Sequence, residues 1–439
     1  MRNSPSYFKK LSWPMAAGGI VVMLVALIVV AATGGFFTND ADRSSLVKAT
    51  PVPLAGSASS QVQDRVAPAV ADNGDSKTVE PDPNFQQELD QAPFSTKGWK
   101  TDFSRHTVPL REIGGAGPGK DGIPALDAPK FTSVERADKW LDAKNPVIAF
   151  ELNGDVRAYP LQILSWHEIV NDVVGGTPVT ITYCPLCNTA VAFDRTLDGV
   201  VYDFGVSGNL RNSDLIMWDR QTESWWQQIT GEAIVGELAG KRLTFIPAPI
   251  IAWSDFRESN PDGLVLSTDT GFDRKYRSSP YIGYDRLDRP PTNFSGDLDR
   301  RLLPKERVAA VTVGDIDVAF PFSILEQERV VNYSAGEPDI VVFFKPGAVS
   351  VLDRTLIVDS KDVGSTGVFD AELDGRKLTF RLQDEEFTDN QTGSVWNILG
   401  KATNGPLAGS QLTPVIHGNH FWFAWGAFKP DTVIYRGAA

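Results

Sequence analysis

The chain has 439 residues, of which 42% are hydrophobic and 22% charged, and its 55 acidic residues against 42 basic ones give a net charge of −13. This length supports two to three ordinary domains with a large packed core, which excludes a minimal fold held together by disulfides. The acidic balance, with no long run of Lys or Arg after residue 10, argues against nucleic acid as a partner.

The N-terminal segment predicts a single-pass membrane anchor. Residues 15–37 carry no charge, and at about 1.5 Å per residue they can cross a bilayer core of roughly 30 Å. Arg2, Lys9 and Lys10 come before them, so the positive-inside rule predicts that residues 1–14 are a cytoplasmic tail and that the globular body is extracytoplasmic, either periplasmic or at the cell surface. A cleaved signal peptide is the alternative. Both interpretations place the body in an oxidising compartment.

Residues 38–95 differ in composition from the rest of the chain. They are rich in Ala, Ser, Pro, Asp and Gln and poor in aromatic residues. Such a segment buries too little apolar surface to offset its ordering entropy, so we expect a flexible, disordered linker between the membrane and the body.

The body contains an internal match. Val147 to Asn171 aligns without a gap on Val308 to Asn332, and later matches occur in the same order, including Trp253 with Trp422. Two copies predict two homologous β-rich lobes from a tandem repeat rather than a solenoid. The expected boundaries are a first lobe at 96–267, a connecting segment at 268–307 and a degenerate second lobe at 308–439.

Alternating β-branched and aromatic residues dominate both copies. They predict strands that include 147–152, 179–183 and 308–313. Short helices are expected at 133–142, 160–164 and 253–259, the second beginning at a proline that suits a first helical turn. The predicted fold class is therefore α+β and mainly β.

Gly175-Gly176 predicts a tight hairpin, because two adjacent glycines suit the positive φ angles of such a turn. The flanking strands would be residues 168–174 and 177–184. With the two glycines as the central turn residues, His167 stands opposite Cys184, with Cβ atoms about 4.5–5.5 Å apart. A bulge would shift this register.

The second copy offers an internal comparison for that register. There the aligned residues are Glu328 and Lys345, whose opposite charges suit cross-strand neighbours.

The only two cysteines form Cys184-Pro185-Leu186-Cys187, at the end of a predicted strand. This spacing allows a dithiol/disulfide couple, a two-thiolate metal chelate or a plain structural disulfide. A neighbouring His167 would lower the thiol pKa and complete a Cys2His set, for which copper is the favoured ion and zinc the less favoured one. In the redox interpretation Cys184, Cys187, His167 and Glu168 are the catalytic candidates, with Glu168 relaying protons.

These observations leave two functions open. The first is a membrane-anchored protein with a thiol site for soft-metal binding or redox chemistry, served by a redox or metal-donor protein partner. The second is a non-catalytic envelope-binding or structural module whose cysteines are merely bridged. His417 and His420 add a candidate ligand pair if the lobes face each other, and are otherwise ordinary loop residues.

Several motifs also resemble a known family, the one catalogued as domain of unknown function 3179, over roughly Gly114 to Tyr435. Asn188 stands where glycine is common in relatives. The family has no established activity, so the resemblance supports the site assignment and implies no reaction. The motifs that carry it are Lys120 to Ala125, Ala158 to Leu161, Trp166 to Asp172, Tyr183 to Cys187, Phe204 to Gly208, Pro280 to Asp285 and Phe421 to Trp425.

Overall fold

The computed structural model describes residues 79–115 and 117–438. The predicted cytoplasmic tail, the anchor at 15–37 and most of the linker therefore lie outside the described residues. Within the described part of the chain, no helix is long and apolar enough to span a bilayer.

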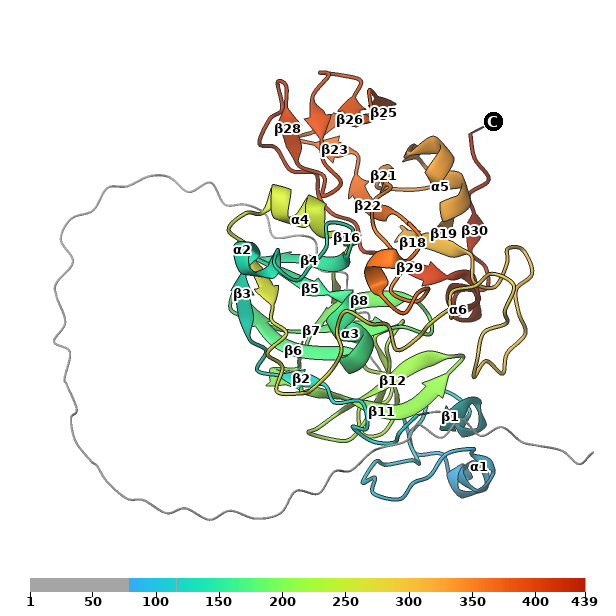
Figure 1. Cartoon of the computed structure of the whole chain (residues 1–439). Helices are drawn as coiled ribbons and strands as arrows, with labels where there is room; N and C mark the ends of the chain where they lie inside the picture. The colour runs from blue at the N-terminus through green and yellow to red at the C-terminus, as the bar shows by residue number, and fades with distance from the viewer. Residues whose placement is uncertain (1–78, 116, 439) are drawn as a thin grey trace, which may run out of the picture. The chain divides into compact units, whose positions relative to one another are not determined.

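The described chain is mainly β with short helices, which confirms the predicted α+β class (Figure 1). The longest helices have seven residues. The helices are α1 (Phe85–Gln91), α2 (Val134–Ala137), α3 (Leu161–His167), α4 (Trp253–Ser259), α5 (Phe322–Glu328) and α6 (Trp422–Phe428), with 3-10 turns η1 (Leu110–Glu112) and η2 (Ile357–Asp359).

Three five-stranded sheets form the first half of the body, and the cysteines lie in one of them. That sheet has the order β15 (Thr244–Ile246), β8 (Thr189–Asp194), β7 (Thr177–Cys184), β6 (Ile169–Val174) and β2 (Leu126–Asp127). The second has the order β16 (Ile250–Ala252), β4 (Pro146–Leu152), β5 (Asp155–Pro160), β17 (Leu264–Leu266) and β3 (Phe131–Ser133). The third has the order β1 (Ile113–Gly115), β11 (Phe204–Arg211), β12 (Asp214–Asp219), β13 (Trp225–Gln227) and β14 (Glu232–Val235), and β9 (Thr196–Leu197) pairs with β10 (Val200–Val201).

Smaller sheets make up the second half. The first has the order β29 (His417–Phe421), β18 (Arg307–Val313), β19 (Ile316–Pro321) and β30 (Val433–Ile434). The next are β20 (Val330–Tyr333), β21 (Ile340–Lys345) and β22 (Ser365–Asp370), then β25 (Phe380–Gln383), β26 (Glu386–Asp389), β27 (Val395–Trp396) and β28 (Ala402–Asn404), with the pair β23 (Glu372–Leu373) and β24 (Arg376–Lys377). Strand β29 lies against β8, which joins the second half to the sheet that carries the thiols.

The hairpin that ends in Cys184 has the predicted register. Strands β6 and β7 pair from Val174 opposite Thr177 to Ile169 opposite Thr182. Both turn glycines have positive φ, and a Cβ on Gly175 would lie 2.2 Å from the carbonyl oxygen of Leu152. Gly175 is therefore required both by its backbone conformation and by the close approach of the neighbouring strand.

Three expectations about element boundaries differ from the structure. Helix α3 continues to His167, beyond the predicted end at Leu164, because the helix ends only where Glu168 takes a positive φ. Helix α2 is capped by Ser133 and ends at Ala137 rather than at residue 142. Part of the expected linker is ordered in the structure, since residues 85–91 form α1.

Helix α1 is held by its apolar residues and by one hydrogen bond. Phe85 and Leu89 pack on an aromatic cluster that includes Trp225, and the Glu88 carboxylate accepts from the Leu110 amide at 2.9 Å. The average composition of residues 38–95 is polar, and it does not reveal these few apolar side chains. The expectation of disorder is therefore wrong for residues 85–91.

The two matching stretches have the same sequence of elements. Strands β4 and β5 and helix α3 have seven, six and seven residues, and so do β18, β19 and α5. The residue after each helix has the same strained conformation, with φ 60° and ψ −31° at Glu168 and φ 63° and ψ −32° at Arg329. Because Arg329 has no thiol nearby in sequence, this strain belongs to the corner between helix and strand and is not itself a sign of function.

Candidate functional site

The two cysteines lie on a tight turn between β7 and β8, here called the thiol turn (residues 184–189). Cys184 is the last residue of β7 and pairs with Thr189 across the ladder. The Asn188 amide closes the turn on the carbonyl oxygen of Pro185 at 3.3 Å. Both thiols are free and buried, with exposed fractions of 2% for Cys184 and 0% for Cys187. They lie in the largest apolar cluster of the described residues.

A third chemical group converges on the thiols from a different sheet. Asp214 is the first residue of β12. One of its carboxylate oxygens and the two sulfur atoms all lie within 4.8 Å of one another. We call Cys184, Cys187 and Asp214 the thiol cluster. In the part of the chain that the structure describes, it is the one group of three or more His, Cys, Asp and Glu side chains close enough to share an ion.

The Asp214 carboxylate is only half satisfied by hydrogen bonds. Its Oδ2 accepts from Gln227 Nε2 at 2.6 Å and from the Ile229 amide at 3.0 Å. Its Oδ1 is buried and accepts no hydrogen bond from the described residues. Burial raises the pKa of Asp214 to about 7, although Ile229, Gln227, the Cys187 thiol and the Leu215 amide oppose the shift. A buried acceptor without a donor costs free energy, and a cation beside it would remove that cost.

The thiols have the same electrostatic problem. Burial raises the pKa of Cys184 above its ordinary 9.0, although a hydrogen bond from Cys187 opposes the shift. Burial and the neighbouring Cys184 raise the pKa of Cys187 well above 9.0. Without a bound cation both groups therefore stay protonated near neutral pH, whereas a metal ion would deprotonate them.

His167 does not stand opposite Cys184, so this predicted cross-strand pair is wrong. Because the residue ends α3 instead of starting β6, it has no place in the ladder. Its buried ring is held elsewhere, with Nδ1 2.8 Å from the carbonyl oxygen of Pro124 and Nε2 2.8 Å from the hydroxyl of Tyr276. Burial lowers its pKa. The ring fastens the connecting segment to the first half.

The comparison pair in the second half fails for the same reason. Glu328 ends α5 and binds the Tyr435 hydroxyl at 2.8 Å, while Lys345 forms an ion pair with Asp255 at 2.6 Å. The opposite charges of Glu328 and Lys345 therefore gave no information about register.

Glu168 lies at the edge of the thiol cluster. Its buried carboxylate accepts a hydrogen bond from the Tyr281 hydroxyl at 3.2 Å. Burial and, to a smaller extent, the negative charge of Asp214 raise the pKa of Glu168 to about 7 against the Tyr281 bond. The charge of Glu168 in turn contributes to the raised pKa of Cys184, so the two groups interact although Glu168 is outside the cluster.

The connecting segment contacts residues that lie beside the cluster. Ser213, beside Asp214, donates its amide to Asn293 at 3.0 Å and its hydroxyl to Thr292. The Cys184 thiol in turn donates to the Ser213 carbonyl oxygen at 3.7 Å. Tyr281, which binds Glu168, also lies on this segment, so three of its residues contact groups beside the cluster.

His417 and His420 lie on strand β29 and not on a loop. Both are buried, and the Nδ1 atom of His420 lies 2.8 Å from the Thr189 hydroxyl in the thiol turn. Neither histidine belongs to a three-group cluster among the described residues.

Sequence reasoning missed Asp214. The one local signal is an aspartate that opens the apolar run Leu215 to Trp218, since a charged residue bordering a fully buried strand is uncommon. Its meeting with the thiols depends on how two sheets pack, which no spacing within the motif encodes.

Comparison with protein families gave one match. A family model described as "Protein of unknown function (DUF3179)" matches residues 120–432, which is more than half of the chain and confirms the resemblance inferred from the motifs. No curated protein and no solved structure matched.

Proposed function

The chain belongs to the family of domain of unknown function 3179, and from this starting point we propose that it binds a metal ion through Cys184, Cys187 and Asp214. The observation that carries the proposal is the convergence of a carboxylate with two thiols, all within 4.8 Å of one another and fully enclosed by the fold. Three acidic groups buried together repel one another when ionised, and a cation is the group that would stabilise all three.

The third donor changes the ion that the set would favour. Cu(I) prefers soft sulfur ligands and accepts an imidazole beside them, whereas a hard carboxylate oxygen suits it less well. Zn(II) is borderline in softness and accepts Cys sulfur together with Asp oxygen. With Asp214 in the place that we had expected His167 to fill, zinc becomes the favoured ion and copper the competitor. Three protein ligands would leave one coordination position for water or another ligand.

One observation favours a second function, a dithiol/disulfide couple. The Asp214 carboxylate, with its raised pKa, lies beside the buried Cys187 thiol, as a proton acceptor would. In thiol–disulfide exchange the Cys184 sulfur would bond to one sulfur of a partner protein's disulfide and break that S–S bond, and the Cys184 proton would pass to the released partner sulfur. Cys187 would then lose its proton to Asp214 and bond to the Cys184 sulfur, which breaks the mixed disulfide, and Asp214 would pass the proton to the second partner sulfur. The Cys184–Cys187 pair is oxidised by two electrons and the partner's two sulfurs are reduced.

Metal analysis of the purified full chain separates these functions. We expect about one zinc per chain, and we expect Cys184→Ser and Cys187→Ser to lose it, because each removes a ligand. Asp389→Asn is the matched control, since Asp389 is as buried as Asp214 but binds only its own β26 turn and Trp396. It should lower stability and retain the metal.

Three other results would contradict zinc binding. Bound copper instead of zinc would show that the site prefers the softer ion, as the sequence had suggested. A metal-free chain whose two thiols cycle reversibly with a disulfide would favour the redox function. A metal-free, unreactive disulfide whose removal only lowers stability would favour a structural or envelope-binding module.

We also propose that residues 15–37 anchor the body outside the cytoplasm, where a protein partner would supply the metal or exchange electrons. The support is the apolar, uncharged segment after Arg2, Lys9 and Lys10.

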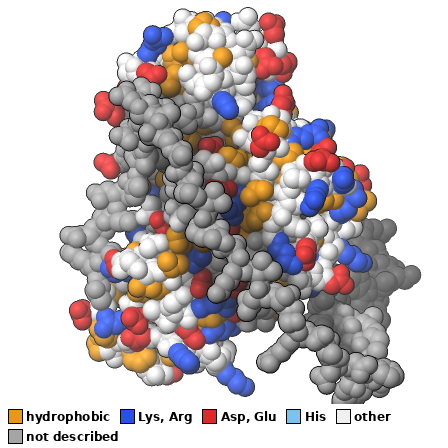
Figure 2. Space-filling model, turned by 90° about the vertical axis from the view of Figure 1, so that its left-hand side faces the viewer, with side chains coloured by type: hydrophobic (Ala, Val, Ile, Leu, Met, Phe, Trp, Pro, Cys, Tyr) orange, Lys and Arg blue, Asp and Glu red, His pale blue; other side chains and the backbone are white. Residues whose placement is uncertain are grey.

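Nucleic acid is not proposed as a partner. Figure 2 shows basic and acidic side chains interspersed on one face, so the described residues there form no basic stripe of the kind that nucleic acid requires. The test of the anchor is a separate experiment. Protease treatment of intact cells or spheroplasts should degrade the body; a protected or freely cytosolic body would contradict the proposal.

We further infer that the body arose from a tandem repeat whose second copy lost or never had the thiols. Besides the equal elements, the two halves share one side-chain network. Asp219 accepts from the Thr222 amide and Trp226 Nε1 at 2.6 and 2.9 Å, and Asp389 accepts from the equivalent groups of Thr392 and Trp396 at 2.6 and 3.1 Å. Independent folding of residues 308–439, when expressed alone, would support separate lobes, and a failure to fold would favour a single cooperative body.

A further inference from the structure

Strand β29 of the second half contacts the thiol turn through three consecutive residues. The Phe421 amide donates to the carbonyl oxygen of Cys187 at 2.9 Å. Asn188 Nδ2 donates to the carbonyl oxygen of Asn419 at 3.3 Å, and the Thr189 hydroxyl lies 2.8 Å from His420 Nδ1. Thus each residue of the turn from Cys187 to Thr189 has a polar partner in the second half of the chain.

The His420 ring is held in one place by two neighbours. It stacks on Trp425 at a centroid distance of 5.1 Å and an interplanar angle of 23°. At the Nε2 edge of the ring, a Cβ at position 418 would lie 2.3 Å from His420 Nε2, so the space that the ring occupies exists because residue 418 is glycine. A ring fixed in this way is a rigid partner for Thr189.

The hydrogen bonds form a chain that ends at Cys187. The Thr189 hydroxyl also lies 3.4 Å from the Cys187 carbonyl oxygen, to which it can only donate. Since it has one proton, both contacts are satisfied when His420 carries its proton on Nδ1 and donates to the Thr189 oxygen. Gln228 Nε2 donates to the Thr189 carbonyl oxygen at 3.1 Å from the first half, so the turn is held from both halves.

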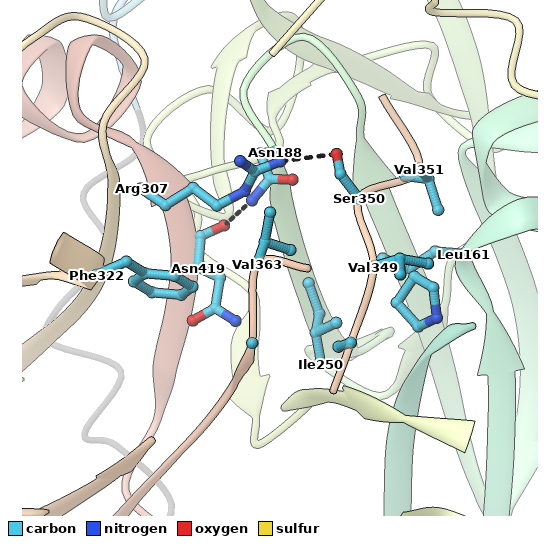
Figure 3. Close-up of a pocket in the computed structure, with 13 residues that line it drawn as sticks. Leu161, Asn188, Ile250, Arg307, Phe322, Val349, Ser350, Val351, Val363 and Asn419 are labelled. Atoms are coloured by element: carbon cyan, nitrogen blue, oxygen red, sulfur yellow. Dashed lines mark hydrogen bonds between the residues drawn. The ribbon is translucent and has the colours of Figure 1, made fainter. Parts of the chain in front are cut away.

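Asn188 connects the two ends of the turn to the second half. Its Oδ1 accepts from the Tyr183 hydroxyl at 3.3 Å, next to Cys184, while its Nδ2 binds Asn419. Figure 3 shows Asn188 reaching Asn419 at the narrow cleft between the halves, with Arg307 bound to Ser350 nearby. Its positive φ of 53° is a conformation that asparagine tolerates better than most residues.

We propose that β29 is a positioning element for the metal site, with His420 and Asn188 as positioning residues that hold the Cys187 backbone where its sulfur meets Cys184 and Asp214. The role in metal affinity rests on the proposed metal binding, whereas the contacts between β29 and the thiol turn do not depend on it. It assigns the second half a role in the site of the first: although it has no thiols, it completes the support of the ligand turn. Outer groups that orient ligands typically affect metal affinity by about 10–100-fold when removed.

The test compares variants of the full chain in zinc titrations against a competing chelator, in thermal unfolding of the metal-free form and in the alkylation rate of Cys187 followed by mass spectrometry. We expect His420→Ala to weaken zinc binding by about 10–100-fold and to speed alkylation of Cys187. His420→Asn, which keeps a donor near the Nδ1 position, should restore most of both. The matched control is His417→Asn, because His417 is a buried neighbour whose Nδ1 binds Val415 and not the turn.

The inference is overturned if His420→Ala and His417→Asn lose similar stability while zinc affinity and Cys187 alkylation in His420→Ala stay at the wild-type level. If the wild-type chain binds no zinc, the proposed function fails. The alkylation rates of the same variants then still decide whether β29 holds the thiol turn, so the two failures can be distinguished.

Discussion

Asp214→Asn is expected to weaken zinc binding by more than about 100-fold while making the metal-free protein more stable at pH 8. Loss of a direct ligand should exceed the roughly 10–100-fold effects of outer groups. The stability gain is a consequence of linkage. The pKa of Asp214 is about 7 in the folded chain against an ordinary 3.8, so between these values the folded state retains a proton that the unfolded state releases, and at pH 8 the folded chain holds a buried charge that an amide lacks.

The sign of this effect sets the pH range for the measurement. Because the folded pKa is raised, the contribution of Asp214 to stability is fully present below about pH 4 and is lost as the pH rises to about 7. The loss is on the order of 4 kcal/mol at about 1.36 kcal/mol per pKa unit. The asparagine side chain of the variant would not titrate, and its amide oxygen can still accept from Gln227 and Ile229.

Urea unfolding of the metal-free wild-type and variant chains at pH 5 and pH 8 checks this prediction, together with zinc titrations at the higher pH. The two stability curves should diverge toward alkaline pH, with a residual slope from Glu168, whose pKa is also raised by burial. Equal zinc affinities in the two chains would remove Asp214 from the ligand set. Parallel stability curves would show that its carboxyl titrates normally.

Acid should destabilise the protein through His420, and His420→Asn should remove that part of the pH dependence. Burial, with a smaller contribution from His417, lowers the pKa of His420 to about 3 from its ordinary 6.5. The folded state therefore keeps the ring neutral while the unfolded state binds a proton. Stability is full above about pH 6.5 and falls as the pH drops toward about 3, by roughly 3 kcal/mol at pH 4.

The comparison is the difference in unfolding free energy between the wild-type and His420→Asn chains, measured at pH 7 and pH 4. The groups that contact the ring are Thr189 and Trp425, which do not titrate in this range, and His417 is the neighbouring titratable group. Between pH 7 and pH 4, we expect the free energy of unfolding of the variant to rise relative to that of the wild type by about 3 kcal/mol. An unchanged difference would mean that His420 is charged or exposed in the folded protein.

Local patterns were sufficient for the hairpins and for the approximate position of most elements. The alternation around Val147 and Val308 indicated strands, and Gly175-Gly176 specified both a turn and the register of Ile169 opposite Thr182. These features depend on the conformational preferences of adjacent residues, so they can be recognised in one sequence. The same is true of Trp253 to Ser259, predicted as a helix and observed as α4.

The predictions were wrong at the ends of short helices and in a short helix that depends on tertiary contacts. The predicted neighbour of Cys184 was displaced because α3 runs three residues beyond its predicted end and keeps His167 in its last turn, and a residue inside the helix has no place in the ladder. Residues 85–91 were expected to be disordered because their few apolar residues gain their stability only from the aromatic cluster that they contact.

The thiol motif, the hairpin that presents it, the mainly β class and the family could all be recognised from the order of residues alone. The partners of the thiol turn emerged only from the packing of the folded chain, because Asp214, beside the sulfur atoms, comes from a different sheet and His420, beside Thr189, from the other half. Burial and electrostatic repulsion act between groups that meet in space. The spacing of residues along one strand constrains their neighbours within a sheet, but it carries no information about which carboxylate or imidazole the folded core places against them.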